Sequence, residues 1–226
     1  MGYLWARIIA LAPARLRRHL GRILLGWQVH PTAHIGRSVI QVRHLSMGPG
    51  TRIGPSNVIR ALEELRLEEG AQIGSLNRII GFPLDIDAFP RSPDRRPALI
   101  LHPYAAVMRA NEIDCSDRVE LGEHAVLAGY GSTILTHSYN LVTDQPTASP
   151  IEIGHHAMVM SGCMLLNGTN VPPRSIISAG SVVTTRLTKE LTFYRGNPAE
   201  AVRDLPETLR YFQRGAAADG ARPPTT

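Results

Sequence analysis

The chain has 226 residues, of which 43% are hydrophobic and only 5% aromatic, with 20 glycines and 17 prolines. This length supports one sizeable domain with a buried core, and the scarcity of aromatic residues favours short strands and tight corners over a helical bundle. Two cysteines, Cys115 and Cys163, do not make a disulfide scaffold, so we expect a reducing compartment, the cytoplasm.

The net charge of +5 is concentrated at the N-terminus. Residues 1–26 contain five arginines and no acidic residue, which leaves 19 basic and 19 acidic residues in the remainder. A nucleic-acid-binding protein normally carries a basic stripe on its folded body, so this distribution argues against nucleic acid as a partner. No apolar run approaches the roughly 20 residues of a transmembrane helix. Arginines follow the apolar stretch IIALAPA, which argues against a cleaved secretion signal.

Residues 1–28 form the first predicted unit, a basic amphipathic helical segment. Between residues 4 and 27, apolar residues recur at helical spacing with arginines between them, and Pro13 interrupts the pattern. Two roles remain open for this segment. It either caps the open end of the next domain or packs on a partner subunit, or it makes weak, salt-sensitive contact with an anionic membrane surface through residues 1–26.

A repeat of six residues organises the chain after this segment. From Ile153 the sequence divides into IGHHAM, VMSGCM, LLNGTN, VPPRSI, ISAGSV and VTTRLT. Each unit opens with an aliphatic residue, and all but the last have a small residue in fifth place, which suits a narrow coil interior. The register extends back through five triplets: Val29/Ile35/Gln41, Met47/Ile53/Ile59, Leu67/Ile73/Ile79, Leu101/Val107/Ile113 and Leu121/Leu127/Thr133.

Irregularities occur only between the third unit of one triplet and the first unit of the next. The two longest are excursions at residues 85–100 and 139–152. A period of three sixes with insertions at one corner describes a coil with three flat faces. Such coils stack by parallel strand pairing at about 4.8 Å per layer. We therefore expect an all-β parallel β-helix over residues 29–205, followed by a C-terminal segment, residues 206–226, that is partly disordered.

These hexads, together with AGSVV at residues 179–183 and GNPAEAVR at residues 196–203, resemble the hexapeptide-repeat acyltransferases. The resemblance implies a left-handed β-helix, a homotrimer and acyl transfer from a coenzyme A thioester. The segment LTHSYN, residues 135–140, resembles the sugar and polysaccharide O-acetyltransferases of that family. The expected reaction transfers an acetyl group from acetyl-CoA to a hydroxyl of a sugar or polysaccharide precursor, without a metal.

His137 is the candidate catalytic residue. It belongs to the last unit before the second excursion, at the corner from which the first excursion leaves two coils earlier, so both excursions can wall a cleft beside it. A neutral imidazole with a pKa near 6.5 accepts a proton at physiological pH. The resemblance assigns His137 the role of general base. The alternative is a loop histidine that holds a backbone carbonyl.

Four further residues are candidates for the acceptor site. Asn111 and Asp114 lie one coil before His137, where they would bind acceptor hydroxyls or orient the base. The alternative for both is a polar corner with an Asx turn. Tyr130 and Tyr139 flank the histidine and suit stacking on a sugar ring, or they are ordinary surface tyrosines.

The donor site is implied by the resemblance alone. It places the pantetheine arm against backbone near Ser161, Gly162, Ala179 and Gly180, where small residues let a thin ligand approach the main chain. It places the phosphates and adenine near Thr184, Thr185, Arg186 and Arg203. Many relatives have lysine where Thr185 stands, so Arg186 would take its place, or Arg186 is simply solvated.

Two other classes remain as alternatives. The first is a β-helical assembly subunit without catalytic activity. The second is a zinc enzyme like the gamma-type carbonic anhydrases, which pair two histidine ligands about five residues apart. No such pair stands near His137, and we expect the adjacent His155 and His156 to diverge on a strand, with at least one of them solvated or facing a subunit.

Overall fold

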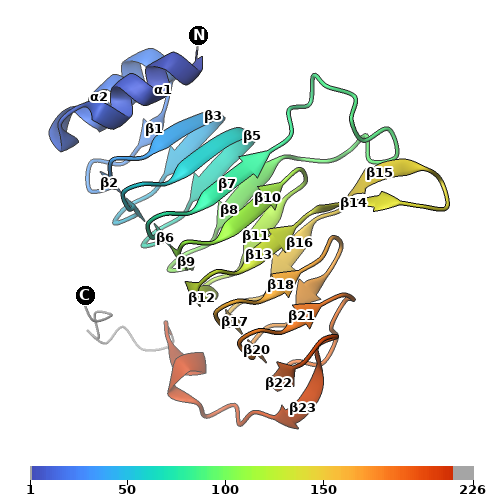
Figure 1. The fold of residues 1–226 in the computed structure, drawn as a ribbon. Coiled ribbons are helices and arrows are strands. Elements are labelled where there is room, and N and C mark those ends of the chain that lie inside the picture. Colours follow the sequence, from blue (N-terminus) through green and yellow to red (C-terminus); the bar gives the residue numbers. More distant parts are fainter. Residues whose placement is uncertain (1, 216–226) are drawn as a thin grey trace.

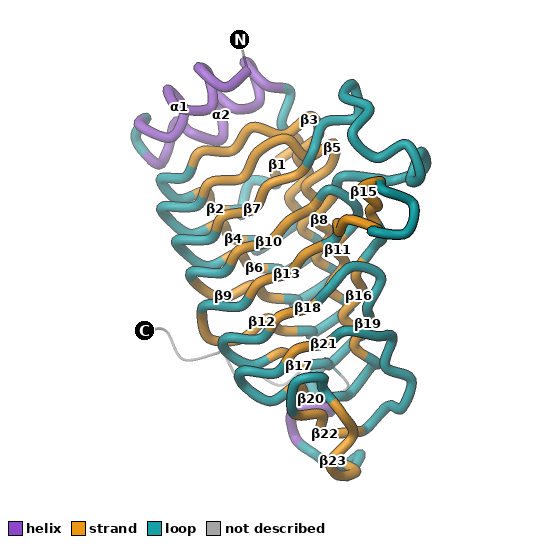
Figure 2. The backbone as a smooth tube through the Cα atoms, turned by 45° about the vertical axis from the view of Figure 1, so that its right-hand side comes forward, coloured by secondary structure: helices purple, strands orange, loops and turns teal. Residues whose placement is uncertain are grey.

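The computed structural model describes residues 2–215, and it confirms the expected left-handed parallel β-helix (Figure 1). Two helices, α1 (Gly2–Leu11) and α2 (Ala14–Leu25), lie across its N-terminal end. Short parallel strands then form three faces, and the coils follow one another along a single axis (Figure 2). The partly disordered tail that the sequence predicts falls mainly in residues 216–226, outside the described residues.

The first face consists of β1 (Gln28–Val29), the second halves of β3 (Val39–Met47) and β5 (Val58–Leu67), β8 (Ala98–Leu101), β11 (Val119–Leu121), β16 (Ile151–Ile153) and β19 (Asn170–Val171). The second face consists of β2 (His34–Ile35), β4 (Arg52–Ile53), β6 (Gln72–Ile73), β9 (Ala106–Arg109), β12 (Val126–Tyr130), β17 (Met158–Val159), β20 (Ile176–Ile177) and β22 (Thr192–Arg195). The third face consists of the first halves of β3 and β5, β7 (Arg78–Gly81), β10 (Glu112–Cys115), β13 (Thr133–Leu135), β18 (Met164–Leu165) and β21 (Val182–Val183).

Columns of aliphatic side chains fill the interior. On the second face Ile53, Ile73, Val107, Leu127 and Val159 pair in register and are at most 1% exposed. Because each layer covers the apolar surface of its neighbour, the core is continuous along the axis. The hexad register predicted from the sequence thus describes this column correctly.

Two of the predicted inward positions were wrong by one residue. Ile40, not Gln41, is buried in the first coil, and Ile134, not Thr133, is buried in the fifth. In the first coil, the corner between the second and third faces is one residue short, since Ile40 follows Ile35 after five residues. In the fifth coil, the same corner has one extra residue, because β12 bulges between Leu127 and Tyr130.

Both excursions begin earlier than the sequence analysis placed them. The first leaves after β7 and returns at β8, so it spans 82–97 and not 85–100. The second is a hairpin of β14 (His137–Asn140) and β15 (Gln145–Ala148), and the chain rejoins the helix at β16, residue 151. We refer to residues 82–97 as the first excursion and to residues 137–148 as the hairpin. At the other end, β23 (Glu200–Asp204) pairs antiparallel with β22, and the short helix η1 (Arg210–Gln213) follows.

The helices close the N-terminal end of the core. Ile9 and Trp27 are at most 2% exposed and belong to the same apolar cluster as the coils. Arg17 is buried between the helices and the first coil, where its guanidinium donates to the carbonyls of Ala12 at 2.9 Å and Ile35 at 3.1 Å. The two cysteines are free and buried. Within residues 2–215, no helix is long and apolar enough to cross a membrane.

A ladder of buried asparagines supports the corner between the second and third faces. Asn77 Nδ2 donates to Asn57 Oδ1 at 3.0 Å and to the Met108 carbonyl at 2.8 Å. Asn77 Oδ1 in turn accepts the backbone N–H of Asn111 at 2.9 Å and its Nδ2 at 3.1 Å. All three side chains belong to residues at most 2% exposed, so these bonds satisfy polar groups that water cannot reach.

Replacing Asn77 with alanine should therefore destabilise the fold. Each buried group left without a partner costs about 1–3 kcal/mol. We expect the free energy of unfolding in urea to fall by at least that amount in Asn77→Ala. Asn140→Ala, which removes an exposed amide at the end of β14, is the control and should have a much smaller effect. Equal losses in the two variants would show that the ladder does not stabilise the coil stack.

Candidate functional site

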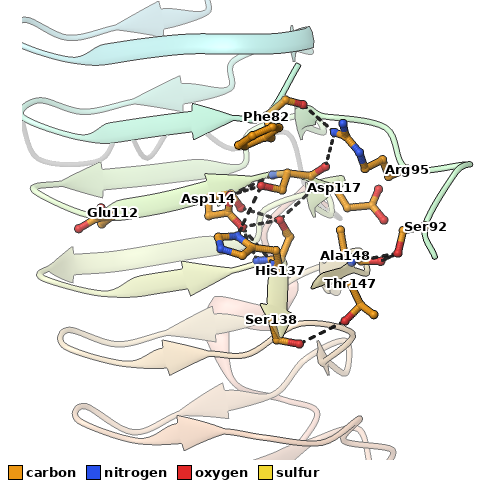
Figure 3. Close-up of polar contacts among 12 residues, drawn as sticks. Phe82, Ser92, Arg95, Glu112, Asp114, Asp117, His137, Ser138, Thr147 and Ala148 are labelled. Carbon is orange, nitrogen blue, oxygen red and sulfur yellow. Dashed lines mark hydrogen bonds and ion pairs between the residues drawn. The ribbon is translucent and has the colours of Figure 1, made fainter. Parts of the chain in front are cut away.

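His137 stands at the corner between the third face of the fifth coil and the first face of the sixth. β13 pairs with β10 in parallel register, which places Leu135 opposite Asp114. The side chains of Asp114 and His137 come from neighbouring layers and meet outside the coil (Figure 3). The corner position of His137 predicted from the sequence is therefore correct, and Asp114 is its direct neighbour.

The Asp114 carboxylate is surrounded by hydrogen-bond donors. Its Oδ2 atom lies 2.8 Å from His137 Nδ1 and also accepts the backbone N–H of His137 at 3.1 Å. The backbone N–H and the hydroxyl of Thr136 lie 2.9 and 2.8 Å from the same oxygen. The Oδ1 atom accepts the hydroxyl of Ser116 at 2.6 Å and its backbone N–H at 3.1 Å. These contacts fix both the carboxylate and the ring that it holds.

The same contacts set the protonation of the pair. Burial alone would raise the pKa of Asp114, but hydrogen bonds from His137, Ser116 and Thr136 hold that pKa below its ordinary value. The hydrogen bond to Asp114 raises the pKa of His137 above 6.5, against a smaller opposing effect of burial. Asp114 is therefore ionised and accepts from Nδ1–H of His137, which leaves the Nε2 lone pair of the neutral ring free to take a proton.

The His137 ring is partly exposed. The His137 side chain is 47% exposed, whereas that of Asp114 is 15% exposed. No partner of Nε2 is found among residues 2–215. The pair thus presents one basic nitrogen to the outside while its negative charge stays behind the ring.

The first excursion and the hairpin are joined beside the histidine. Ser92 Oγ donates to the Ala148 carbonyl at 2.8 Å and accepts the Ala148 N–H at 2.9 Å. Ala148 is the residue that pairs with His137 in the hairpin. Arg91 Nε donates to Gln145 Oε1 at 2.8 Å. The ring of Phe89 lies 5.8 Å from the His137 ring, measured between centroids. The two excursions therefore form one wall at this corner.

A buried arginine anchors that wall to the coil. Arg95 is 7% exposed, and its guanidinium donates to the Phe82 carbonyl at 2.6 Å (Figure 3). The guanidinium also donates to the carbonyls of Pro83 at 2.7 Å and Ser116 at 3.2 Å. It also lies 4.9 Å from the centre of the Phe89 ring. Beside it is an open cleft of about 470 Å³, lined by residues 91–96, by Asp117 and Arg118, and by residues 148–150.

Three of the four predicted acceptor residues do not join Asp114 beside the ring. Asn111 belongs to the buried ladder, so its predicted contact with acceptor hydroxyls is wrong. Tyr130 is 65% exposed but ends β12, at the corner on the far side of the third face. Tyr139 stays in the hairpin, where its hydroxyl donates to Asp144 at 2.9 Å.

The predicted donor residues lie in separate groups. Ser161–Gly162 and Ala179–Gly180 stack at the corner between the second and third faces, where the Gly180 N–H donates to the Ser161 carbonyl at 3.0 Å. Thr184, Thr185 and Arg186 are exposed and follow β21. They lie at the corner where the third face leads to the first face of the next coil, as His137 does, but two coils later. Arg203 lies on β23, with its guanidinium 5.0 Å from the centre of the Phe193 ring. Within one chain, the third face separates the first group from His137.

The adjacent histidines behave differently from the sequence prediction. His155 and His156 lie in a turn, not on a strand, and their Nδ1 atoms are 3.2 Å apart. His156 Nε2 donates to the Arg214 carbonyl at 2.7 Å, and the His156 ring lies 4.9 Å from that of His124. Within the described part of the chain, no three potential metal ligands are grouped so that they could hold an ion.

Several residues of the site were missed in the sequence. Ser116 and Thr136 stand within two residues of Asp114 and His137, so their proximity was a usable signal. No local signal marks Phe89 or Arg95, because they reach the site through an excursion that leaves the helix two coils earlier.

Comparisons with known proteins support the fold. No family model matches the chain, and no curated protein matches it. The polysialic acid O-acetyltransferase OatWY superimposes with a TM-score of 0.61 at 13% identity, over 83% of this chain and 92% of that one. A variant of the N-acyltransferase AntD from Bacillus cereus, in complex with dTDP-4-amino-4,6-dideoxyglucose and coenzyme A, superimposes with a TM-score of 0.53 at 10% identity, over 84% and 89% of the two chains. The chain therefore has the left-handed β-helix fold of the hexapeptide-repeat acyltransferases.

Proposed function

We propose that this protein is an O-acetyltransferase that moves an acetyl group from acetyl-CoA to a hydroxyl of a sugar or polysaccharide precursor. The observation that carries the proposal is the hydrogen bond of 2.8 Å between Asp114 and His137 Nδ1, on a ring whose side chain is 47% exposed. The fold shared with an O-acetyltransferase and an N-acyltransferase favours acyl transfer as the reaction.

In this mechanism His137 is the general base. Its Nε2 atom takes the proton of the acceptor hydroxyl as the oxygen attacks the thioester carbonyl. The new C–O bond forms, the C–S bond breaks, and the imidazolium returns the proton to the departing thiolate. Asp114 keeps Nδ1 protonated and stabilises the imidazolium without itself taking the proton, because its pKa is lowered.

The alternatives for a nucleophile on the protein do not fit. Cys115 is fully buried, and burial raises the pKa of its thiol well above the ordinary value. Burial also raises the pKa of Cys163. The Ser116 hydroxyl is 3.5 Å from His137 Nδ1, but it is 2.6 Å from Asp114 Oδ1 and donates there. These contacts favour direct transfer in a ternary complex over an acyl-enzyme.

Glycines at one corner support the proposed donor site. Ser56, Leu76 and Ala110 adopt positive φ angles at the corner between the second and third faces in the earlier coils. In the later coils Gly162 and Gly180 take that position, and a Cβ built on either would meet no atom within 4 Å. The corner is therefore open main chain where the pantetheine arm is proposed to lie.

We also propose a homotrimer in the cytoplasm. The third face separates His137 from the glycine corner within one chain, so a donor held at that corner cannot lie beside the histidine of the same subunit. Apposed subunits would bring the glycine corner of one chain to the His137 corner of its neighbour. The competing proposal is an inactive assembly subunit. The separation of His137 from the glycine corner within one chain fits that proposal too, and binding of acetyl-CoA distinguishes the two.

Replacing His137 with alanine should abolish most of the activity. General-base catalysis contributes about 100- to 10,000-fold, and we expect turnover to fall by a factor in that range. The measurement is transfer from labelled acetyl-CoA to a panel of hydroxylated sugars and glycans, with circular dichroism to check folding. His155→Ala removes an exposed imidazole elsewhere and should keep full activity. A folded His137→Ala protein with unchanged turnover would refute the role of the residue.

The Asp114–His137 hydrogen bond predicts a pH dependence. Only neutral His137 accepts the proton, so kcat/KM should rise with pH through the His137 pKa, which lies above 6.5. Asp114→Asn removes the charge that raises this pKa. In this variant we therefore expect the rise of kcat/KM with pH to move to lower pH and its plateau value to fall. A rise at the same pH in both proteins would mean that a different group controls the rate.

Replacing Gly180 with alanine should weaken donor binding selectively. A methyl group on this open corner would stand where the pantetheine arm is proposed to lie, and we expect the Kd of acetyl-CoA by calorimetry to rise at least about tenfold. Gly50→Ala, at the corner between the first and second faces, is the control, because Gly50 has a similar positive φ angle and a Cβ built there would have its nearest heavy atom 3.9 Å away. Equal affinities in the two variants would place the donor elsewhere. No acetyl-CoA binding by the unmodified protein would favour the assembly subunit.

A further inference from the structure

Helix α1 is apolar on two opposite sides. Ala6, Ile9 and Ala10 are at most 5% exposed and pack inward. On the outer side Leu4, Trp5, Ile8 and Leu11 are 62, 38, 42 and 75% exposed. At 3.6 residues per turn, these four side chains occupy a single arc of the helix surface. The inner side is explained by the closure of the core, but the outer side has no such role among residues 2–215.

Helix α2 adds exposed apolar side chains and charge to the same end of the molecule. Leu16 and Ile23 are 48 and 67% exposed, and α2 lies beside α1 across the end of the coil stack (Figures 1 and 2). Arg15 and Arg22 are exposed on the same helix, and no ion pair involving either is found in the part of the chain that the structure describes. We call the six exposed apolar side chains and these two arginines the end surface.

The charge of the whole N-terminal end has one sign. Residues 1–62 contain nine arginines and no aspartate or glutamate, and the first acidic residue is Glu63. The rest of the chain holds 15 basic and 19 acidic residues. Anionic groups that approach this end therefore meet no carboxylate from the helices or the first coil.

We propose that the end surface docks on a membrane that contains anionic phospholipids. Apolar side chains that enter the headgroup region, flanked by arginines, are the features of a helix that lies in the plane of an interface, and tryptophan is favoured at that depth. A second copy of the chain fits less well as the occupant. It would place a second set of arginines against the first, with no acidic side chain from residues 1–62 between them.

The test is cosedimentation of the full chain with vesicles. We expect it to bind vesicles of phosphatidylcholine with 30% phosphatidylglycerol at low salt, and binding to weaken as salt rises. Binding to pure phosphatidylcholine should be much weaker. Arg15→Gln with Arg22→Gln should lower the affinity by about fivefold per arginine, since each basic residue near such a surface contributes about 1 kcal/mol.

The apolar part has its own matched variants. Leu11→Glu places a carboxylate on the end surface and should lower the affinity at least about tenfold. Val142→Glu makes the same kind of change at a side chain that is 94% exposed in the hairpin, and it should leave binding unchanged. Melting temperatures should match in both variants, because neither side chain is buried.

Results of three kinds would overturn the proposal. The first is no binding of the unmodified chain to anionic vesicles at low salt. The second is equal binding to neutral and anionic vesicles, or equal binding by Leu11→Glu and Val142→Glu. The third is a change in oligomeric state by light scattering in Leu11→Glu, which would identify the end surface as a contact between copies of this chain.

Discussion

Every layer of this protein depends on its neighbours to cover its interior. The strands of the coils each bury only a few aliphatic side chains in the narrow interior, and on the second face a single one lines up from layer to layer, as in the column of Ile73, Val107 and Leu127. No coil could bury that surface alone, so the stack is stable only while the inward positions remain aligned. Extra residues are therefore accommodated where the chain turns, and both excursions leave from one corner.

That constraint also builds the candidate site. Parallel register between β10 and β13 holds Asp114 and His137 in neighbouring layers at a fixed separation, although 22 residues stand between them in the chain. The rigid coil supplies the carboxylate and its donors, and the first excursion supplies the Phe89 ring and the wall. A basic nitrogen is thus oriented by groups whose positions are set by the packing of the core and not by the hairpin alone.

The sequence predicted the fold well because the aliphatic and small positions of a hexad follow directly from the shape of the coil interior. It failed at Gln41 and Thr133, because corners gain or lose a residue without any change in hydrophobic pattern. The corner position of His137 was predictable for the same reason as the coils. The role of Asn111 was not, since an asparagine at a corner looks the same whether it faces a ligand or bonds to the asparagine of the next layer. Contacts made by the first excursion, such as Phe89 with His137, have no local signature at all.

The most direct test of this account is the protonation of the His137 ring, measured by 15N NMR of the histidine side chains and assigned by comparison with the spectrum of His137→Ala. Above its pKa, we expect the neutral ring to carry its proton on Nδ1, because the ionised Asp114 carboxylate accepts from that atom. The Nε2 atom would then show the shift of an unprotonated nitrogen. A neutral ring with its proton on Nε2 would contradict the account, because no accessible nitrogen would remain to accept the hydroxyl proton.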